Sequence, residues 1–184
     1  MLNIVPRSIR ERQFYKSLAR PLRKFIARHW LNSTRYLPDG FDRIYHIHIR
    51  KSAGTSSNSM FWGEADLSME DIWREPIFIK KGRVFVQHNK PLIEEGNYFF
   101  ASSHFPIWDL QLPAKTFTFT ILRDPYQRLV SLYKYYSWVT QVKPNEGYRE
   151  DPSYFVLLKQ TNLLNRSFRD FVDALSPKYL HNQI

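Results

Sequence analysis

The sequence predicts an α/β fold with a central, mainly parallel sheet flanked by helices. Three observations support this prediction. Of the 184 residues, 43% are hydrophobic, which suffices for one ordinary core. Short β-favouring runs alternate along the chain with segments of helical periodicity. No repeat or low-complexity stretch interrupts this alternation.

The predicted strands are short runs of β-branched and aromatic residues. These runs lie at 44–49, 77–79, 84–86, 97–102 and 117–122. Four residues, Lys80 to Arg83, separate the second run from the third, and this spacing predicts a hairpin. The run at 117–122 mixes β-branched and aromatic residues, as buried strands do.

The predicted helices follow the strands. A helix can begin after the serine-rich segment that ends at Ser57. Pro125 suits the first turn of a second helix, which we expect to run to about Trp138. Apolar residues on one face predict a third helix over 167–175.

Basic residues concentrate near the N-terminus. The chain has 27 Lys and Arg against 17 Asp and Glu, a formal net charge of +10, and residues 7–30 contain eight of these bases but only one acid. One apolar helical stripe accompanies them, formed by Phe14, Leu18, Leu22, Phe25 and Ile26. Pro21 is expected to divide the stripe between two short helices. We therefore predict a basic arm over 1–38 and an α/β domain over 39–184.

The arm has several possible roles. It could dock on an anionic membrane surface or on nucleic acid, or serve as an Arg-rich targeting segment. It could equally be a solvated basic helix whose stripe packs on the domain. Outside residues 7–30 the charge is nearly balanced, which disfavours nucleic acid as the main partner.

Composition excludes several kinds of site. The chain has no cysteine, so disulfides, cysteine nucleophiles, thiolate zinc sites and Fe–S clusters are ruled out. The histidines show neither H-x-x-x-H nor H-E-x-x-H spacing, and we expect no metal. No apolar run reaches the roughly 18 residues that span a bilayer. We expect a cytoplasmic or membrane-peripheral protein, or a Golgi-lumenal one if the chain is a fragment of a longer eukaryotic protein.

The first candidate site is the turn after the strand at 44–49. Small and hydroxylated residues there let the backbone approach an anion, and the following helix directs free N–H groups at it. Lys51 adds a mobile positive charge, and Thr55, Ser56 and Ser57 add hydroxyl donors. The lysine precedes Gly54, so the pattern differs from the nucleotide P-loop G-x-x-x-x-G-K-[ST]. The pattern predicts a phosphate cradle, although an ordinary loop can share it.

The second candidate site follows the strand at 117–122. Arg123 lies at the carboxyl end of that strand, where open α/β sheets bind ligands, and a guanidinium holds phosphate with two hydrogen bonds. Ser131 lies about two turns along the next helix and could face the same ligand. The alternatives are an ion pair of Arg123 with Asp124 or another acid, and a solvated helix face for Arg128 and Ser131.

The third candidate is His104, just past the strand at 97–102 and two residues before Pro106. An imidazole titrates near neutral pH and can act as a general base. A lone histidine can also be purely structural. His46 and His48 alternate with isoleucines, so at least one should face the core, whereas His88 belongs to no recognisable constellation.

Together these segments resemble the PAPS-dependent sulfotransferases. Residues 48–56, HIRKSAGTS, resemble the 5′-phosphosulfate loop H-I-P-K-T-G/A-G-T-S. Residues 123–136 are similar to the 3′-phosphate motif R-D-P-x-x-R-L-x-S-x-Y-x-Y-Y. Residues 103–106, SHFP, resemble the G-H-F-P segment of the carbohydrate branch related to heparan sulfate 2-O-sulfotransferase. The resemblance extends over about residues 44–183.

This resemblance implies a P-loop-like three-layer fold that binds 3′-phosphoadenosine 5′-phosphosulfate (PAPS) without a metal. The implied donor-binding residues are Arg50, Lys51, Ser52, Ala53, Gly54, Thr55, Ser56, Arg123 and Ser131. Lys51 would also help to neutralise the leaving phosphate, and His104 would take the proton from an acceptor hydroxyl. The branch implies a glycan acceptor.

Two departures from the family pattern affect these expectations. Arg50 stands where the family has proline, which adds a possible phosphate contact. The chain stops at Ile184, where the family continues with further helices, so we expect a domain incomplete at its C-terminus. A nucleotide kinase or NTPase-like protein, and a noncatalytic nucleic-acid or membrane-binding protein using the arm, are the alternative functions.

Overall fold

The computed structural model describes a central α/β body, a helical pair above it and two short pieces of the arm. The described residues are 21–22, 25–26, 37–63, 76–141, 163 and 165–175, the side chains of 139–141 excepted. Within these residues, no helix is long and apolar enough to cross a membrane.

A five-stranded sheet forms the centre, in the order β2-β3-β4-β1-β5. The strands are β1 (Arg43–Ile47), β2 (Ile77–Lys80), β3 (Arg83–Gln87), β4 (Phe100–Ser103) and β5 (Thr116–Thr120). β2 and β3 form the predicted antiparallel hairpin, and every other neighbouring pair is parallel. The predicted α/β class and the mainly parallel sheet are therefore confirmed.

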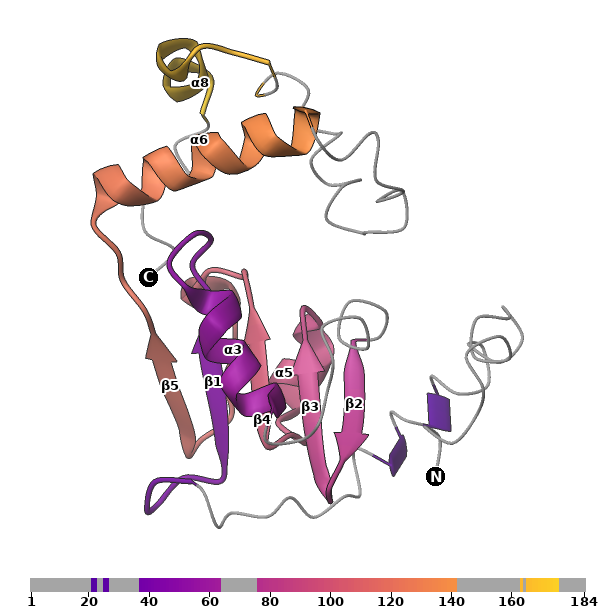
Figure 1. The fold of residues 1–184 in the computed structure, drawn as a ribbon. Helices are drawn as coiled ribbons and strands as arrows, with labels where there is room; N and C mark the ends of the chain where they lie inside the picture. Colours follow the sequence, from indigo (N-terminus) through magenta and orange to yellow (C-terminus); the bar gives the residue numbers. More distant parts are fainter. Residues whose placement is uncertain are drawn as a thin grey trace, which may run out of the picture.

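Helices cover both faces of the sheet, giving three layers (Figure 1). Side chains alternate between the faces of β1: Ile44 joins the apolar cluster beneath α3 (Gly54–Gly63), whereas Tyr45 joins the cluster beneath α5 (Lys90–Glu95). Trp62 anchors α3 to its face, and Ile93 anchors α5 to the other.

The short helix α5 had no counterpart among the predicted elements. Asn89 caps its start, because the Asn89 side chain accepts a hydrogen bond from Leu92 N–H, and Pro91 lies in the first turn. Gly96 ends the helix at a φ of 77°. Six residues are too few for helical periodicity to show, although both capping signals are present in the sequence.

Helix α6 (Pro125–Gln141) lies beyond the carboxyl ends of the strands, with α8 (Phe168–Ala174) packed on its outer side (Figure 1). The predicted helix over 125–138 is thus confirmed and slightly longer. The two helices share an apolar cluster of their own, which includes Leu132, Tyr136 and Phe171. Ser167, the first residue of the predicted third helix, is the N-cap of α8, and its side chain accepts a hydrogen bond from Asp170 N–H.

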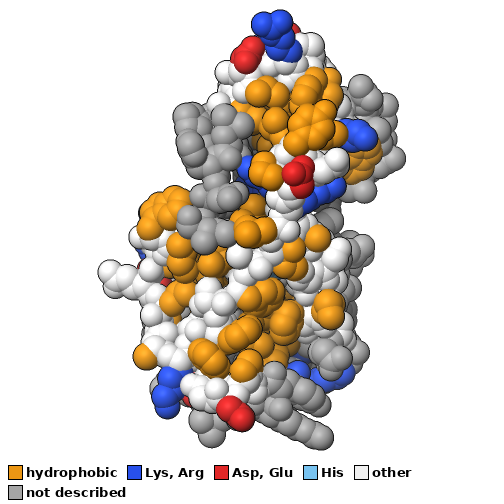
Figure 2. Space-filling view, turned by 90° about the vertical axis from the view of Figure 1, so that its left-hand side faces the viewer, with side chains coloured by type: hydrophobic (Ala, Val, Ile, Leu, Met, Phe, Trp, Pro, Cys, Tyr) orange, Lys and Arg blue, Asp and Glu red, His pale blue; other side chains and the backbone are white. Residues whose placement is uncertain are grey.

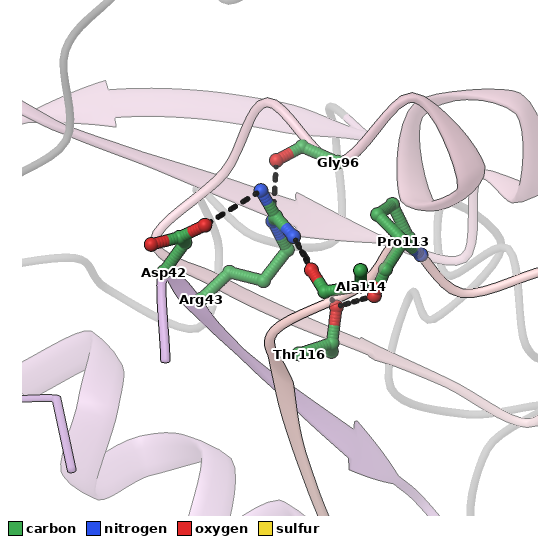
Figure 3. A network of polar contacts seen from close by, with 6 residues as sticks. All are labelled: Asp42, Arg43, Gly96, Pro113, Ala114 and Thr116. Carbon is green, nitrogen blue, oxygen red and sulfur yellow. Dashed lines mark hydrogen bonds and ion pairs between the residues drawn. The ribbon is translucent and has the colours of Figure 1, made fainter. Parts of the chain in front are cut away.

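At the opposite end of the sheet, Arg43 joins three chain segments (Figure 3). Its Nε donates to the carbonyl of Gly96 at 2.8 Å, and its Nη1 donates to the carbonyl of Ala114 at 2.6 Å. A weaker contact of 3.5 Å reaches Thr116 Oγ1, and Asp42 forms an ion pair at 3.9 Å. These bonds hold the beginnings of β1 and β5 beside the end of α5.

Most of the predicted arm lies outside the described residues. Residues 21–22 and 25–26 are helical. Of the apolar stripe, Leu22 is 47% exposed and Phe25 is 61% exposed. The division into an arm over 1–38 and a domain over 39–184 stays a prediction.

Candidate functional site

Three of the predicted site segments meet at the carboxyl edge of the sheet. β1 lies between β4 and β5 and runs parallel to both, with Ile47 opposite Ser103 on one side and Thr120 on the other. The segments that leave these strand ends carry Lys51, His104 and Arg123. The parallel register therefore places the two proposed anion-binding motifs and the proposed base at one edge, beneath α6 (Figure 1).

The turn between β1 and α3 has a strained backbone. Lys51 and Ala53 both adopt positive φ, 64° and 60°, a region that residues other than glycine rarely occupy. Ser52 is buried between them, and its Oγ has no hydrogen-bond partner in the part of the chain that the structure describes. Ala53, Thr55 and Ser56 are exposed. A strained turn with an unsatisfied buried hydroxyl at a helix start is suited to receive an anion.

Gly54, the first residue of α3, cannot carry a side chain here. A Cβ at this position would overlap Cδ2 and Nε2 of the His48 imidazole. Because Gly54 has no side chain, the first turn of α3 can pack directly against the His48 ring.

Lys51 and Arg123 lie next to each other. The Arg123 guanidinium donates from Nη1 to the carbonyl of Lys51 at 3.3 Å, and the Lys51 ammonium lies 4.7 Å from the ring centroid of Tyr135 on α6. Burial lowers the pKa of Lys51, and the positive charge of Arg123 lowers it further. The two cations repel each other, and an anion bound between them would reduce that repulsion.

The Asp124 carboxylate caps α6. The side-chain Oδ1 accepts a hydrogen bond from Gln127 N–H at 2.8 Å, and the backbone carbonyl of Asp124 accepts one from Arg128 N–H at 2.9 Å. The alternative of an ion pair with Arg123 is thus replaced by capping, and the Arg123 guanidinium is directed to the turn instead.

His104 is held by the backbone of the first motif. Its Nδ1 lies 2.6 Å from the carbonyl oxygen of His48. A carbonyl can only accept, so Nδ1 carries the proton and Nε2 of the neutral ring keeps its lone pair. Burial lowers the pKa of His104 well below its usual value, and the charges of His48, His88 and Arg50 lower it further. The ring is therefore in its basic form at neutral pH.

Four histidines gather around this point. The His104 ring centroid lies 4.3 Å from that of His48 and 4.7 Å from that of His88. His46, fully buried, stacks on Phe119 at 4.5 Å. Sequence reasoning missed His88, which follows β3 directly; its N–H donates to the carbonyl of Ser102, because β3 runs parallel to β4.

A buried amide joins α3 to the sheet behind these rings. Asn58 Oδ1 lies 2.6 Å from Nδ1 of His46, and Asn58 Nδ2 donates to Ser102 Oγ at 3.0 Å. Asn58 and His46 are fully buried. This bridge couples the helix that starts the anion turn to the strand that leads to His104, and no sequence motif indicated it.

Ser131, and three aromatic side chains near the site, are less directly connected. Ser131 is half-buried on α6, and within the described residues no hydrogen bond joins it to Arg123, so its role stays a prediction. Tyr136 is buried between α6 and α8, and the Tyr133 hydroxyl donates to the carbonyl of Arg166. Trp108 is 64% exposed on the 3₁₀ turn η2 (Ile107–Asp109). Of these three aromatics, Trp108 is the most exposed.

Within the described residues, no group of three or more His, Asp and Glu side chains is arranged to hold a metal ion.

A family model described as the sulfotransferase family matches residues 34–183. The chain belongs to the sulfotransferase family. Neither curated proteins nor solved structures give a match. Membership supports sulfuryl transfer as the general reaction of this sulfotransferase, and it implies a nucleotide sulfate donor and an acceptor.

Proposed function

We propose that the protein transfers a sulfuryl group from PAPS to a hydroxyl of a carbohydrate. In this reaction the acceptor oxygen forms a bond to sulfur in line with the bond that breaks. The electron pair of the broken S–O bond leaves on the 5′-phosphate, and the acceptor proton goes to Nε2 of His104. The donor supplies the activated sulfuryl group, and the chain supplies positioning and charge.

The observation that carries this proposal is the pair formed by Lys51 and Arg123. The two cations come from the ends of two parallel strands and are joined by the hydrogen bond from Arg123 to the Lys51 carbonyl. Burial lowers the pKa of Lys51 and the charge of Arg123 lowers it further, and a polyanion between the two cations would be attracted by both charges. A donor with phosphate at both the 5′ and 3′ positions matches such a pair.

The residues at the turn fit the 5′ side of this donor. Ser52 has an unsatisfied buried hydroxyl, and α3 begins at Gly54 with free N–H groups. Lys51 would stabilise the negative charge that develops on the leaving phosphate. Arg123 would hold the 3′-phosphate, with Ser131 as its proposed partner.

His104 fits the role of base for two reasons. Its hydrogen bond to the His48 carbonyl leaves the Nε2 lone pair free to accept a proton. Burial keeps the ring neutral but also makes it a weaker base, and the negative charge of a bound donor would raise its pKa again. Its position one residue beyond β4 places it beside the turn that carries Lys51. The proposed base and the proposed donor turn therefore belong to one site, with His104 on the acceptor side of the sulfur and the leaving phosphate on the opposite side.

The acceptor and the location are proposed from the sequence. The SHFP segment at 103–106 resembles the branch that includes heparan sulfate 2-O-sulfotransferase, which favours a glycan hydroxyl. We also propose a cytoplasmic or membrane-peripheral location, with residues 7–30 in contact with anionic lipid through their charge.

The donor assignment is tested by thermal shift with two nucleotides. Adenosine 3′,5′-bisphosphate should raise the melting temperature clearly more than ATP, which lacks a 3′-phosphate. Arg123→Met should remove most of that preference. Lys134→Met, which deletes a charge from an exposed position on α6, should retain it. Equal stabilisation of the unmodified protein by both nucleotides would rule out the proposed donor.

A further inference from the structure

Helix α6 brings an aromatic ring to the candidate site. The Lys51 ammonium lies over the ring of Tyr135, 4.7 Å from its centroid, and Tyr135 belongs to α6. Figure 1 shows α6 beyond the carboxyl ends of the strands, and Figure 2 views its junction with the sheet from the β5 side, with Lys and Arg side chains along it. This contact joins the anion turn to the helix that follows Arg123.

The Tyr135 ring is held by its aromatic neighbours. Trp138 stacks on it at a centroid distance of 6.2 Å and an interplanar angle of 29°. Tyr136 meets it edge-on, also at 6.2 Å, and is itself buried against Phe171 of α8. Because the ring is fixed by packing while the Lys51 side chain is a flexible four-carbon stem, the contact restricts the lysine more than the tyrosine.

The three tyrosines in the second half of α6 have different partners. Tyr133 and Tyr136 lie three residues apart and therefore on one face of the helix, where both rings pack on Phe171 of α8 at centroid distances of 5.4 and 5.5 Å. Tyr135 lies between them in the sequence, and its ring meets the anion turn. Of the three, Tyr135 is therefore the one whose ring contacts the site.

The charge of Lys51 is subject to opposing influences. Burial lowers the pKa of Lys51, and the positive charge of Arg123 lowers it further, so both favour the neutral amine. The face of an aromatic ring carries partial negative charge and attracts a cation. The Tyr135 ring therefore favours the charged form of Lys51, which is the form that can stabilise a leaving phosphate.

We propose that Tyr135 is a positioning residue for Lys51 in sulfuryl transfer. An ammonium that rests with one side on a ring face keeps N–H donors on its other side, so Lys51 can contact the ring and a phosphate oxygen of the donor together. Tyr135 thus holds the ammonium at the anion turn before the donor binds, which reduces the side-chain freedom lost on binding. The inference rests on the proposed function, because it takes from there the role of Lys51 at the leaving phosphate.

Adenosine 3′,5′-bisphosphate is the probe for this inference, because its 5′-phosphate carries the charge that develops on the leaving group and no acceptor is needed. Tyr135→Leu removes the ring face and should weaken binding about 2- to 30-fold in isothermal titration calorimetry, the range of a cation–π contact. Tyr135→Phe keeps the ring and should bind like the unmodified protein. Tyr126→Leu makes the same change at an exposed position on α6 and should also leave binding unchanged.

A double-mutant cycle separates the contact from a general effect on the helix. In a Lys51→Met background, Tyr135→Leu should have no further effect on binding. An effect of the same size in both backgrounds would overturn the inference and leave the donor assignment intact. Absence of binding by the unmodified protein would instead contradict the proposed function on which the inference rests. Circular dichroism of each variant verifies that it is folded.

The pH dependence of the same binding gives a second readout. Without the ring face, Lys51 should lose its proton at a lower pH, so the affinity of Tyr135→Leu should fall at a lower pH than that of the unmodified protein between about pH 7.5 and 9.5. The charge of Arg123, which also acts on Lys51, is constant in this range because a guanidinium is always protonated. Tyr135→Phe should follow the unmodified protein. Coincident pH profiles for Tyr135→Leu and Tyr135→Phe would contradict the positioning role.

Discussion

Nδ1 of His104 lies 2.6 Å from the carbonyl oxygen of His48, which joins the proposed base to the residue that opens the anion turn. The ring is thereby oriented by the backbone of the segment that would hold the donor. A shift of that backbone would move the base as well. The proposed base and the proposed leaving-group site are therefore structurally coupled at the carboxyl edge of the sheet.

Replacing His104 by glutamine should reduce turnover without preventing donor binding. A general base typically contributes about 10²–10⁴-fold, so kcat should fall by roughly that factor. Radiolabelled transfer from PAPS to an oligosaccharide panel measures turnover, and thermal shift with adenosine 3′,5′-bisphosphate measures binding. Turnover equal to that of the unmodified protein would remove His104 from the mechanism.

Gly54 and Gly63 lie at opposite ends of α3 and should respond differently to alanine. Gly54→Ala forces a Cβ into the His48 ring, and overpacking of this kind costs about 1–3 kcal/mol of unfolding free energy. A Cβ at Gly63 meets no atom within 4 Å, so Gly63→Ala should leave stability unchanged or raise it by up to about 1 kcal/mol. Urea unfolding compares the two variants. Equal stability of both proteins would mean that His48 does not pack on Gly54.

Asn58 should be more important for stability than its neighbour Ser59. Asn58→Ala leaves buried polar atoms of His46 and Ser102 without their partner, and each such loss costs about 1–3 kcal/mol. Ser59 is exposed and its hydroxyl donates to the carbonyl of Thr55, so Ser59→Ala should change stability by less than about 0.5 kcal/mol. Chemical denaturation of both variants measures the difference. An Asn58→Ala protein with the same unfolding free energy as the unmodified protein would show that the bridge does not stabilise the fold.

Local sequence signals predicted much of the fold. The strand that became β1, the β2–β3 hairpin and α6 were each indicated by residue pattern or by proline, because their signals lie within a few neighbouring residues. The strand predicted at 97–102 is β4 at Phe100–Ser103. Its boundary moved because pairing with β1 and β3, rather than propensity, determines where the strand starts.

The candidate site was predictable only in part. Lys51, His104 and Arg123 follow strand ends, and a parallel sheet brings such ends together, so their proximity could be expected. His88 and Asn58 could not be found in this way. His88 reaches the site because the hairpin strand β3 runs parallel to β4, and Asn58 because α3 packs over His46. Both facts depend on contacts between segments distant in sequence.

The buried histidines should make the protein less stable in mild acid. Burial lowers the pKa of His46 and of His104, and it lowers the pKa of His48 to about 3. A histidine in the unfolded chain titrates near 6.5. Below about pH 6.5 the unfolded state therefore binds protons that the folded state does not, so unfolding becomes more favourable as the pH falls. Each such histidine contributes up to about 1.4 kcal/mol per pH unit in this range.

Urea unfolding between about pH 7.5 and 5.5 measures this effect, since most carboxyl groups titrate below that window. The unfolding free energy should decrease across the window, and it should decrease less in His104→Gln, which has lost one of the histidines with a lowered pKa. Exposed histidines would titrate alike in both states and give no such slope. A stability that is constant over this range would therefore show that these rings are not held neutral by burial.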